Sequence, residues 1–165
     1  MTLNYKLVKE KKLQLSFPSE LFINGNYQKS LSEKFFDNIS PIDGKIINQI
    51  SFAQQEDIDK ADVVVVGVNS QGLDWFIDYV KKFNIEKKKF LLITKGMYVN
   101  DNNKLDIFPN KILKNIDQDI NITAVTGPCK AQELANKNLT NICFVNEELD
   151  IAIQISNIFK NNFYI

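Results

Sequence analysis

Few side chains in this sequence could do chemistry, because none of its 165 residues is histidine or arginine. Without histidine there is no Ser-His-Asp or Cys-His pair and no ordinary zinc site, so we predict neither a catalytic residue nor a metal site. A phosphate group would have to be held by lysine, by backbone N–H groups or by helix N-termini.

The composition is that of an ordinary globular protein. Apolar residues make up 44% and charged residues 24% of the chain, which is long enough for one domain with a real core. Twenty lysines balance twenty acidic residues, so we expect no nucleic-acid partner and no attraction to a membrane surface. No apolar run approaches the ~18 residues of a spanning helix. Because no signal peptide is recognisable, we expect a cytoplasmic protein with Cys129 and Cys143 as free thiols.

Residues 1–60 carry short, interrupted patterns. Residues 21–27 surround an Asn-Gly turn signal and predict a β-hairpin. A second turn is predicted at residues 41–44, and residues 54–61 have weak helical character. We expect this segment to be a leader that lies outside the central strands of the fold.

From Asp62 onward the pattern alternates between strands and helices. Apolar runs predict strands near residues 62–68, 90–94, 121–126 and 140–145, with a short last strand at 163–165. We expect the first four to be neighbours in one parallel sheet. Helical spacing and capping signals predict helices over residues 72–83 and 105–117, from 127–128 onward, and from Asn146 to Lys160. This alternation favours an α/β fold with one mainly parallel sheet and flanking helices. We expect Cys143 and Trp75 to be packed inside it.

Three short motifs lie at the ends of predicted strands, where ligands bind in α/β sheets. Because consecutive α/β units place these strand ends along one crevice, we expect Lys95 to lie beside the turn at residues 126–131. Residues 61–71 read Ala-Asp-Val-Val-Val-Val-Gly-Val-Asn-Ser-Gln, residues 94–96 read Thr-Lys-Gly, and residues 126–131 read Thr-Gly-Pro-Cys-Lys-Ala. In this order they resemble the later half of the nucleotide-binding domain of NAD(P)-dependent glycerol-3-phosphate dehydrogenase, which has Pro in place of Asn69 and Ser or Thr in place of Cys129. The resemblance covers residues 61–165 and implies a partial Rossmann-like domain.

The resemblance also implies a set of binding residues. Lys95 would contact both the cofactor, NAD or NADP, and a small phosphorylated substrate. Gly127 and Cys129 would contact the substrate, while Ser70 and the backbone of Ala131 would contact the cofactor. The family's reaction is hydride transfer between NAD(P)H and dihydroxyacetone phosphate, with sn-glycerol 3-phosphate as the product.

The leader resembles a different family, at residues 21–25 (Leu-Phe-Ile-Asn-Gly), 40–44 (Ser-Pro-Ile-Asp-Gly) and 55–61. These stretches are similar to the entry segment of aldehyde dehydrogenases, which is structural in those enzymes and carries none of their catalytic residues. The two resemblances meet near residues 60–62. They imply an aldehyde-dehydrogenase-like leader of residues 1–60 joined to a partial NAD-binding domain of residues 61–165.

Two parts of a complete glycerol-3-phosphate dehydrogenase have no counterpart in the sequence. The six glycines form no G-x-G-x-x-G loop for the pyrophosphate, and the family's helical C-terminal domain is not represented. We therefore expect a dehydrogenase-like fragment that is inactive alone. The alternatives are a nucleotide-binding fragment without catalysis or a self-association module that uses an unpaired sheet edge, and a relative of the aldehyde dehydrogenases.

Overall fold

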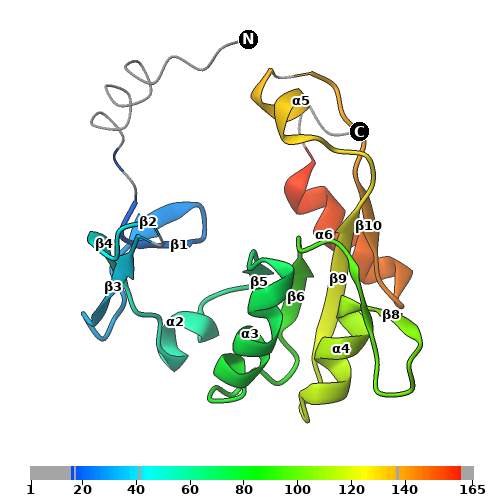
Figure 1. The fold of residues 1–165 in the computed structure, drawn as a ribbon, viewed down its shortest axis with the longest axis horizontal. Helices are drawn as coiled ribbons and strands as arrows, with labels where there is room; N and C mark the ends of the chain where they lie inside the picture. The colour runs from blue at the N-terminus through cyan, green and yellow to red at the C-terminus, as the bar shows by residue number, and fades with distance from the viewer. Residues whose placement is uncertain (1–15, 17, 41, 137, 161–165) are drawn as a thin grey trace. The chain divides into compact units, whose positions relative to one another are not determined.

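The computed structural model describes residues 16, 18–40, 42–136 and 138–160 (Figure 1). The chain falls into two compact units that divide between Ala61 and Asp62. Each unit has its own strands and is considered by itself below.

Two hairpins and a short helix make up the described part of the first unit. Strands β1 (Leu21–Ile23) and β2 (Asn26–Gln28) pair in antiparallel register. Both residues of their turn, Asn24 and Gly25, have positive φ, as a two-residue hairpin turn with the right twist requires. Strands β3 (Phe35–Ile39) and β4 (Ile46–Ser51) form a second hairpin, and α2 (Gln55–Asp59) follows it. The predicted first hairpin and weak helix are confirmed, while Pro41 of the predicted second turn lies outside the described residues.

The carboxylate of Asp57 joins α2 to the loop after β2. It accepts hydrogen bonds from the Ser30 hydroxyl at 2.7 Å, the Leu31 N–H at 3.1 Å and the Gln54 N–H at 2.9 Å. Burial raises the pKa of Asp57, but these hydrogen bonds and the charge of Lys60 outweigh burial and hold the pKa below its usual value. The buried carboxylate is therefore charged at neutral pH and fully partnered.

A four-stranded sheet forms the centre of the second unit. Its strands are β5 (Val63–Val66), β6 (Lys89–Leu92), β9 (Asn121–Thr126) and β10 (Cys143–Val145), in the order β10-β9-β6-β5. β5, β6 and β9 are parallel to one another, whereas β10 runs antiparallel to β9. All four strands come from residues after Asp62, as predicted. The prediction of four parallel strands is wrong for β10, because the helix before it is too short to carry the chain back along the sheet.

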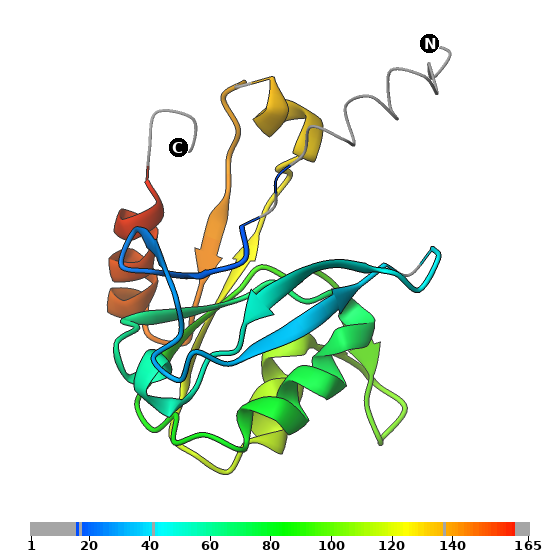
Figure 2. The same ribbon diagram turned by 90° about the vertical axis from the view of Figure 1, so that its left-hand side faces the viewer.

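Helices cover the two faces of this sheet (Figure 2). α3 (Leu73–Val80), preceded by the 3-10 turn η1 (Ser70–Gly72), and α4 (Phe108–Asn115) lie on one face, and α6 (Leu149–Phe159) lies on the other. Phe76 of α3 packs edge-on against Phe90 of β6, and Phe144 of β10 stacks on Phe159 of α6. The mainly parallel α/β architecture with flanking helices is confirmed.

The boundaries of three predicted helices differ from the sequence interpretation. Residues 97–107 form a hairpin of β7 (Met97–Val99) and β8 (Leu105–Ile107), so α4 begins at Phe108, with Pro109 in its first turn. α5 (Ala131–Ala135) begins later than residues 127–128, because Gly127 has a φ of +104° that no α-helix accepts. α6 begins at Leu149, and the Asn146 side chain accepts a hydrogen bond from the Glu148 N–H just before it. The predicted last strand at 163–165 lies outside the described residues.

Two side chains expected inside the fold are on the surface. Cys143 is exposed because β10 is an edge strand and alternate residues point to opposite faces, so that Phe144 and not Cys143 meets α6. Trp75 is 61% exposed, since the buried face of α3 is formed by Leu73, Phe76, Ile77 and Val80. Its indole stacks on Tyr79, with ring centroids 5.2 Å apart.

Candidate functional site

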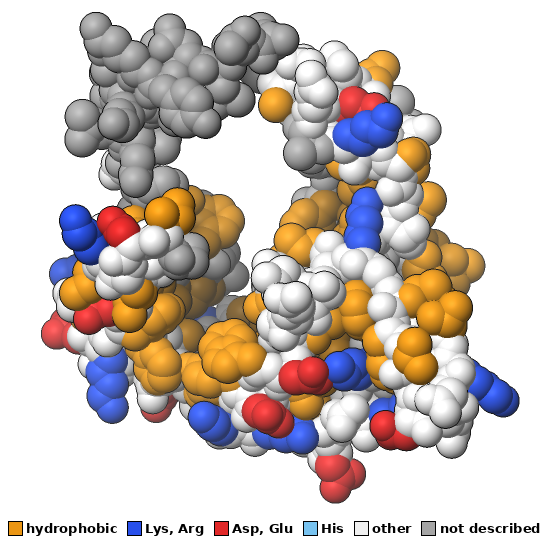
Figure 3. All heavy atoms as spheres, viewed as in Figure 1, with side chains coloured by type: hydrophobic (Ala, Val, Ile, Leu, Met, Phe, Trp, Pro, Cys, Tyr) orange, Lys and Arg blue, Asp and Glu red, His pale blue; other side chains and the backbone are white. Residues whose placement is uncertain are grey.

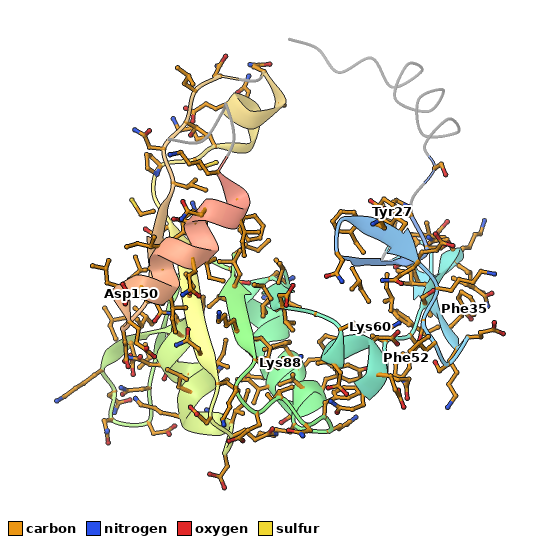
Figure 4. The ribbon with its side chains drawn as sticks, turned by 180° about the vertical axis from the view of Figure 1, so that it is seen from behind. Tyr27, Phe35, Phe52, Lys60, Lys88 and Asp150 are labelled. Carbon is orange, nitrogen blue, oxygen red and sulfur yellow. The ribbon has the colours of Figure 1, made fainter. Side chains whose placement is uncertain are left out.

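The loops that follow β5, β6 and β9 meet at one edge of the sheet, because these three strands are parallel. They carry Ser70, Lys95 and Gly127, respectively. Lys88, which directly precedes β6, and Asp150, in the first turn of α6, belong to the opposite edge (Figure 4). The residues predicted from the three motifs therefore lie on a common edge.

Lys95 bridges two of these loops. Its Nζ lies 2.8 Å from the carbonyl oxygen of Gly127 and donates a hydrogen bond to it. The preceding Thr94 donates its hydroxyl hydrogen to the carbonyl oxygen of Val68, which ties the loop after β6 to the loop after β5. The prediction that Lys95 lies beside the turn at residues 126–131 is confirmed. Because an ammonium group has three N–H donors, the bond to Gly127 leaves donors free for an anion.

Gly127 allows its turn to pack closely against the chain that enters β10. A Cβ at this position would lie 3.2 Å from the Asn141 carbonyl oxygen and 3.4 Å from the Cys143 backbone nitrogen. Its φ of +104° is in a region that other residues rarely adopt. Both constraints make glycine the residue that fits this turn, and they leave its carbonyl oxygen directed at Lys95.

The other predicted site residues surround this pair. Cys129 is partly buried and lies before α5, not inside its first turn as expected. Ala131 is the first residue of α5. Ser70 is exposed and begins the 3-10 turn after β5, where the Asn69 side chain accepts a hydrogen bond from the Gly72 N–H at 2.8 Å. Asn69 thus caps the turn that presents Ser70.

Two cavities reach this edge of the sheet, and Lys95 lines both of them. One has a volume of about 470 Å³ and is also lined by Gly96, Met97, Ile107, Thr126 and Gly127. The other has a volume of about 420 Å³ and is mostly apolar, with walls from Val65, Leu91, Val125, Cys129 and Phe144. Hydrophobic side chains also gather on the surface over β8 and β10 (Figure 3). A cationic group therefore lies between apolar walls at the carboxyl ends of the strands.

The described ranges contain neither a metal centre nor a membrane-spanning helix. Among these residues no group of three or more Asp, Glu or Cys side chains is arranged to hold a metal ion. In the same part of the chain, no helix has the length and apolar character needed to cross a membrane.

Comparisons with known proteins identify relatives of this chain. A family model described as NAD-dependent glycerol-3-phosphate dehydrogenase N-terminus matches residues 28–152. Glycerol-3-phosphate dehydrogenase [NAD(P)+] of Mycoplasma mobile is 26% identical over 151 residues, which are 88% of this chain and 45% of that protein. The solved structure of Plasmodium falciparum glycerol-3-phosphate dehydrogenase superposes with a TM-score of 0.59 and 20% identity, over 70% of this chain and 32% of that one.

A second, shorter likeness is to cytosolic 10-formyltetrahydrofolate dehydrogenase of Mus musculus, at 42% identity over 59 residues, or 36% of this chain and 6% of that protein. The chain thus spans less than half of each of these proteins. The predicted resemblance to glycerol-3-phosphate dehydrogenases is confirmed, and the family match begins at residue 28, inside the predicted leader. The likeness of the leader to aldehyde dehydrogenases stays a prediction.

Proposed function

The chain belongs to the NAD-dependent glycerol-3-phosphate dehydrogenase family, and we propose that the loops after β5, β6 and β9 are its share of a cofactor and substrate site. The reaction of the complete site would be hydride transfer between NAD(P)H and dihydroxyacetone phosphate, giving sn-glycerol 3-phosphate. The chain itself would bind the phosphorylated substrate and part of the cofactor without catalysing the hydride transfer.

The observation that carries this proposal is the contact between Lys95 and the Gly127 turn. The ammonium group is exposed, lies at a strand end and keeps free donors, which suits it to the phosphate of a small substrate. Gly127 and Cys129 would lie against that substrate, because each of them lines one of the two cavities beside Lys95. NAD(P)H, when bound, would supply the hydride.

The cofactor contacts in this proposal are fewer than a complete site provides. Ser70 and the backbone of Ala131, together with Lys95, could hold one part of a dinucleotide at the common strand edge. The sequence has no G-x-G-x-x-G turn to present N–H groups to a pyrophosphate. The residues present therefore fit part of NAD or NADP, and we propose that a tight complex requires groups that they do not supply. The proposed location of the chain is the cytoplasm.

A phosphate titration tests the anion site directly. Inorganic phosphate should shift the amide NMR signals of residues 127–131 in the full chain, with a dissociation constant near a millimolar, which corresponds to about 4 kcal/mol. Lys95→Ala should abolish these shifts and leave the fold nearly intact, as expected of a surface lysine. Lys104→Ala, which removes an exposed lysine in the β7–β8 turn, is the matched control and should bind phosphate like the original chain. Shifts that persist in Lys95→Ala would show that the site is elsewhere.

The exposed strand β5 favours a second candidate function, a binding or self-association module without catalysis. Among the described residues β5 has one hydrogen-bonded neighbour, β6, and Val65 is 49% exposed. An unprotected apolar edge strand is a natural template for pairing with another chain. Sedimentation of the full chain over a range of concentrations would distinguish a self-associating module from a monomeric dehydrogenase fragment.

A further inference from the structure

The β7–β8 hairpin begins directly after Lys95 and Gly96. Its apolar side chains face outward and its polar side chains face inward, the reverse of the usual arrangement. Its outward-facing side chains are apolar and exposed, and they pair across the two strands: Met97 with Ile107, and Val99 with Leu105. Its inward-facing positions, Tyr98 and Asp106, are polar and less exposed. The Met, Val, Leu and Ile side chains of this hairpin therefore do not hold it in place, so its position depends on the contacts of the inward residues, Tyr98 and Asp106.

Asp106 makes most of those inward contacts, and its side chain is 12% exposed. Its Oδ1 accepts a hydrogen bond from the Asn110 side chain at 2.7 Å, and its Oδ2 pairs with the Lys114 Nζ at 2.7 Å. Both partners belong to α4, so the carboxylate clamps the hairpin to that helix. The Tyr98 hydroxyl and the Asn100 amide reach Oδ2 at longer distances of 3.4 and 3.5 Å. The pairing with Lys114, together with Asn110, holds the pKa of Asp106 well below its usual value.

The start of α4 in turn confines the backbone beside Lys95. Gly96 has a φ of +135°, and a Cβ on it would lie 2.8 Å from Cε2 of Phe108, the first residue of α4. The Phe108 ring is 4% exposed and stacks on Tyr98, with ring centroids 6.3 Å apart. The loop that carries Lys95 is thus held on one side by β6 and on the other by a hairpin that is fastened to α4.

We propose that Asp106 is a positioning residue, which keeps Lys95 against the Gly127 turn by fastening the β7–β8 hairpin to α4. Without the carboxylate, only the contacts of the Tyr98 ring would fasten the hairpin to α4, and burial of the apolar outer face would favour another position. Movement of the hairpin would release Gly96 from Phe108 and draw Lys95 away from Gly127. The effect on anion binding rests on the proposed function, whereas the effect on the position of Lys95 does not.

NMR of the full chain without ligand tests the positioning role itself. In the original chain the side-chain protons of Lys95 should give a nuclear Overhauser contact to Gly127, whose carbonyl oxygen lies 2.8 Å from the Lys95 Nζ. Asp106→Asn should remove this contact and move the amide signals of residues 95–107. Asp101→Asn, the same chemical change in the exposed turn of the same hairpin, should leave the Lys95 contact unchanged. If Asp106→Asn keeps the Lys95 contact, the proposal is overturned.

A second comparison separates positioning from a general loss of stability. Ile112→Val removes one methylene from the buried face of α4 without touching Asp106, so it should lower stability but preserve the Lys95 contact. Equal loss of that contact in Ile112→Val and Asp106→Asn would refute a specific role for Asp106. If Asp106→Asn does not fold, Lys114→Met can replace it in this test. This variant removes the partner of the carboxylate and keeps the carboxylate itself, and it should also lose the Lys95 contact.

Phosphate titration then tests the anion site separately from the positioning role of Asp106. Asp106→Asn should weaken phosphate binding by about fivefold, the size expected of residues that are coupled through a backbone shift. Absence of phosphate shifts in the original chain would contradict the anion site. Loss of the Lys95 contact in Asp106→Asn would, in that case, still support the positioning role.

Discussion

Two acidic side chains with lowered pKa values hold loops in place in this molecule. Asp106 fastens a hairpin in the second unit, and Asp57 joins α2 to the loop after β2 in the first. Asp57 is 3% exposed, so each of its hydrogen bonds is made away from water. A buried carboxylate that accepts several N–H and O–H groups cannot be replaced by an amide without leaving donors unsatisfied.

Asp57→Asn should therefore destabilise the first unit by about 2 kcal/mol at pH 7. The pKa of the folded carboxyl lies below the unfolded value, so this stabilisation is present at pH values above the unfolded pKa of about 3.9 and is lost as pH falls through the folded pKa. The difference in the free energy of unfolding between the original chain and Asp57→Asn should thus be constant from neutral pH to about pH 5 and should narrow below pH 4.

Amide hydrogen exchange in β3 and β4 measures this difference, because Trp75 belongs to the second unit and its fluorescence would not report on the first. Glu56→Gln, the same chemical change at an exposed position of α2, serves as the control and should have little effect. Equal exchange rates in the Asp57→Asn protein and the original chain would contradict a structural role for the carboxylate.

The elements of the second unit differ in how far the sequence specified them. The run of four valines at 63–66 and the apolar residues 90–92 predicted adjacent parallel strands, because such runs are typical of strands covered on both faces. The meeting of Lys95 with the turn at residue 127 followed from the same alignment, since parallel strands end at one edge.

The β7–β8 hairpin could not be predicted in this way. Its apolar residues point outward and its polar residues inward, so the pattern indicates the wrong face, and its position depends on Asn110 and Lys114 in the next helix. The direction of β10 was missed for a related reason, because the length of a connecting helix is poorly marked in the sequence. Contacts between elements, which no local pattern records, decide both features.

Gly96→Ala tests how tightly the hairpin and α4 confine the Lys95 loop. The new methyl group would overlap Phe108, and the φ of +135° strains any residue with a Cβ. We expect a loss of about 3 kcal/mol from these two terms together, measured by urea unfolding with Trp75 fluorescence. Gly67→Ala is the matched control, because its Cβ would meet only Ile93, at an ordinary 3.4 Å, and its φ is not positive. Equal stability of the two variants would show that Phe108 does not confine the loop.

At the scale of the whole molecule, the proposed site is one part of a crevice along the strand ends, and among the described residues β5 is the last strand on its side of the sheet. The loops after β5, β6 and β9 provide Ser70, Lys95 and Gly127, but the match to the Plasmodium falciparum enzyme covers 32% of that chain. A dinucleotide makes contacts along the whole crevice at the strand ends, and its pyrophosphate depends on N–H groups of a glycine-rich turn. The number of these contacts that the chain provides should therefore limit its affinity for the dinucleotide.

NAD(P)H should accordingly bind the full chain weakly, with no saturation below about a millimolar, because one lysine and a few backbone groups cannot replace a glycine-rich turn. A titration that follows nicotinamide fluorescence measures this affinity, and NADH and NADPH should behave alike if Lys95 contributes only its charge. Lys95→Ala should remove whatever residual binding is seen, while Lys104→Ala should not. A dissociation constant near a micromolar, worth about 8 kcal/mol, would contradict the prediction. It would mean that groups other than a glycine-rich turn present N–H donors to the pyrophosphate.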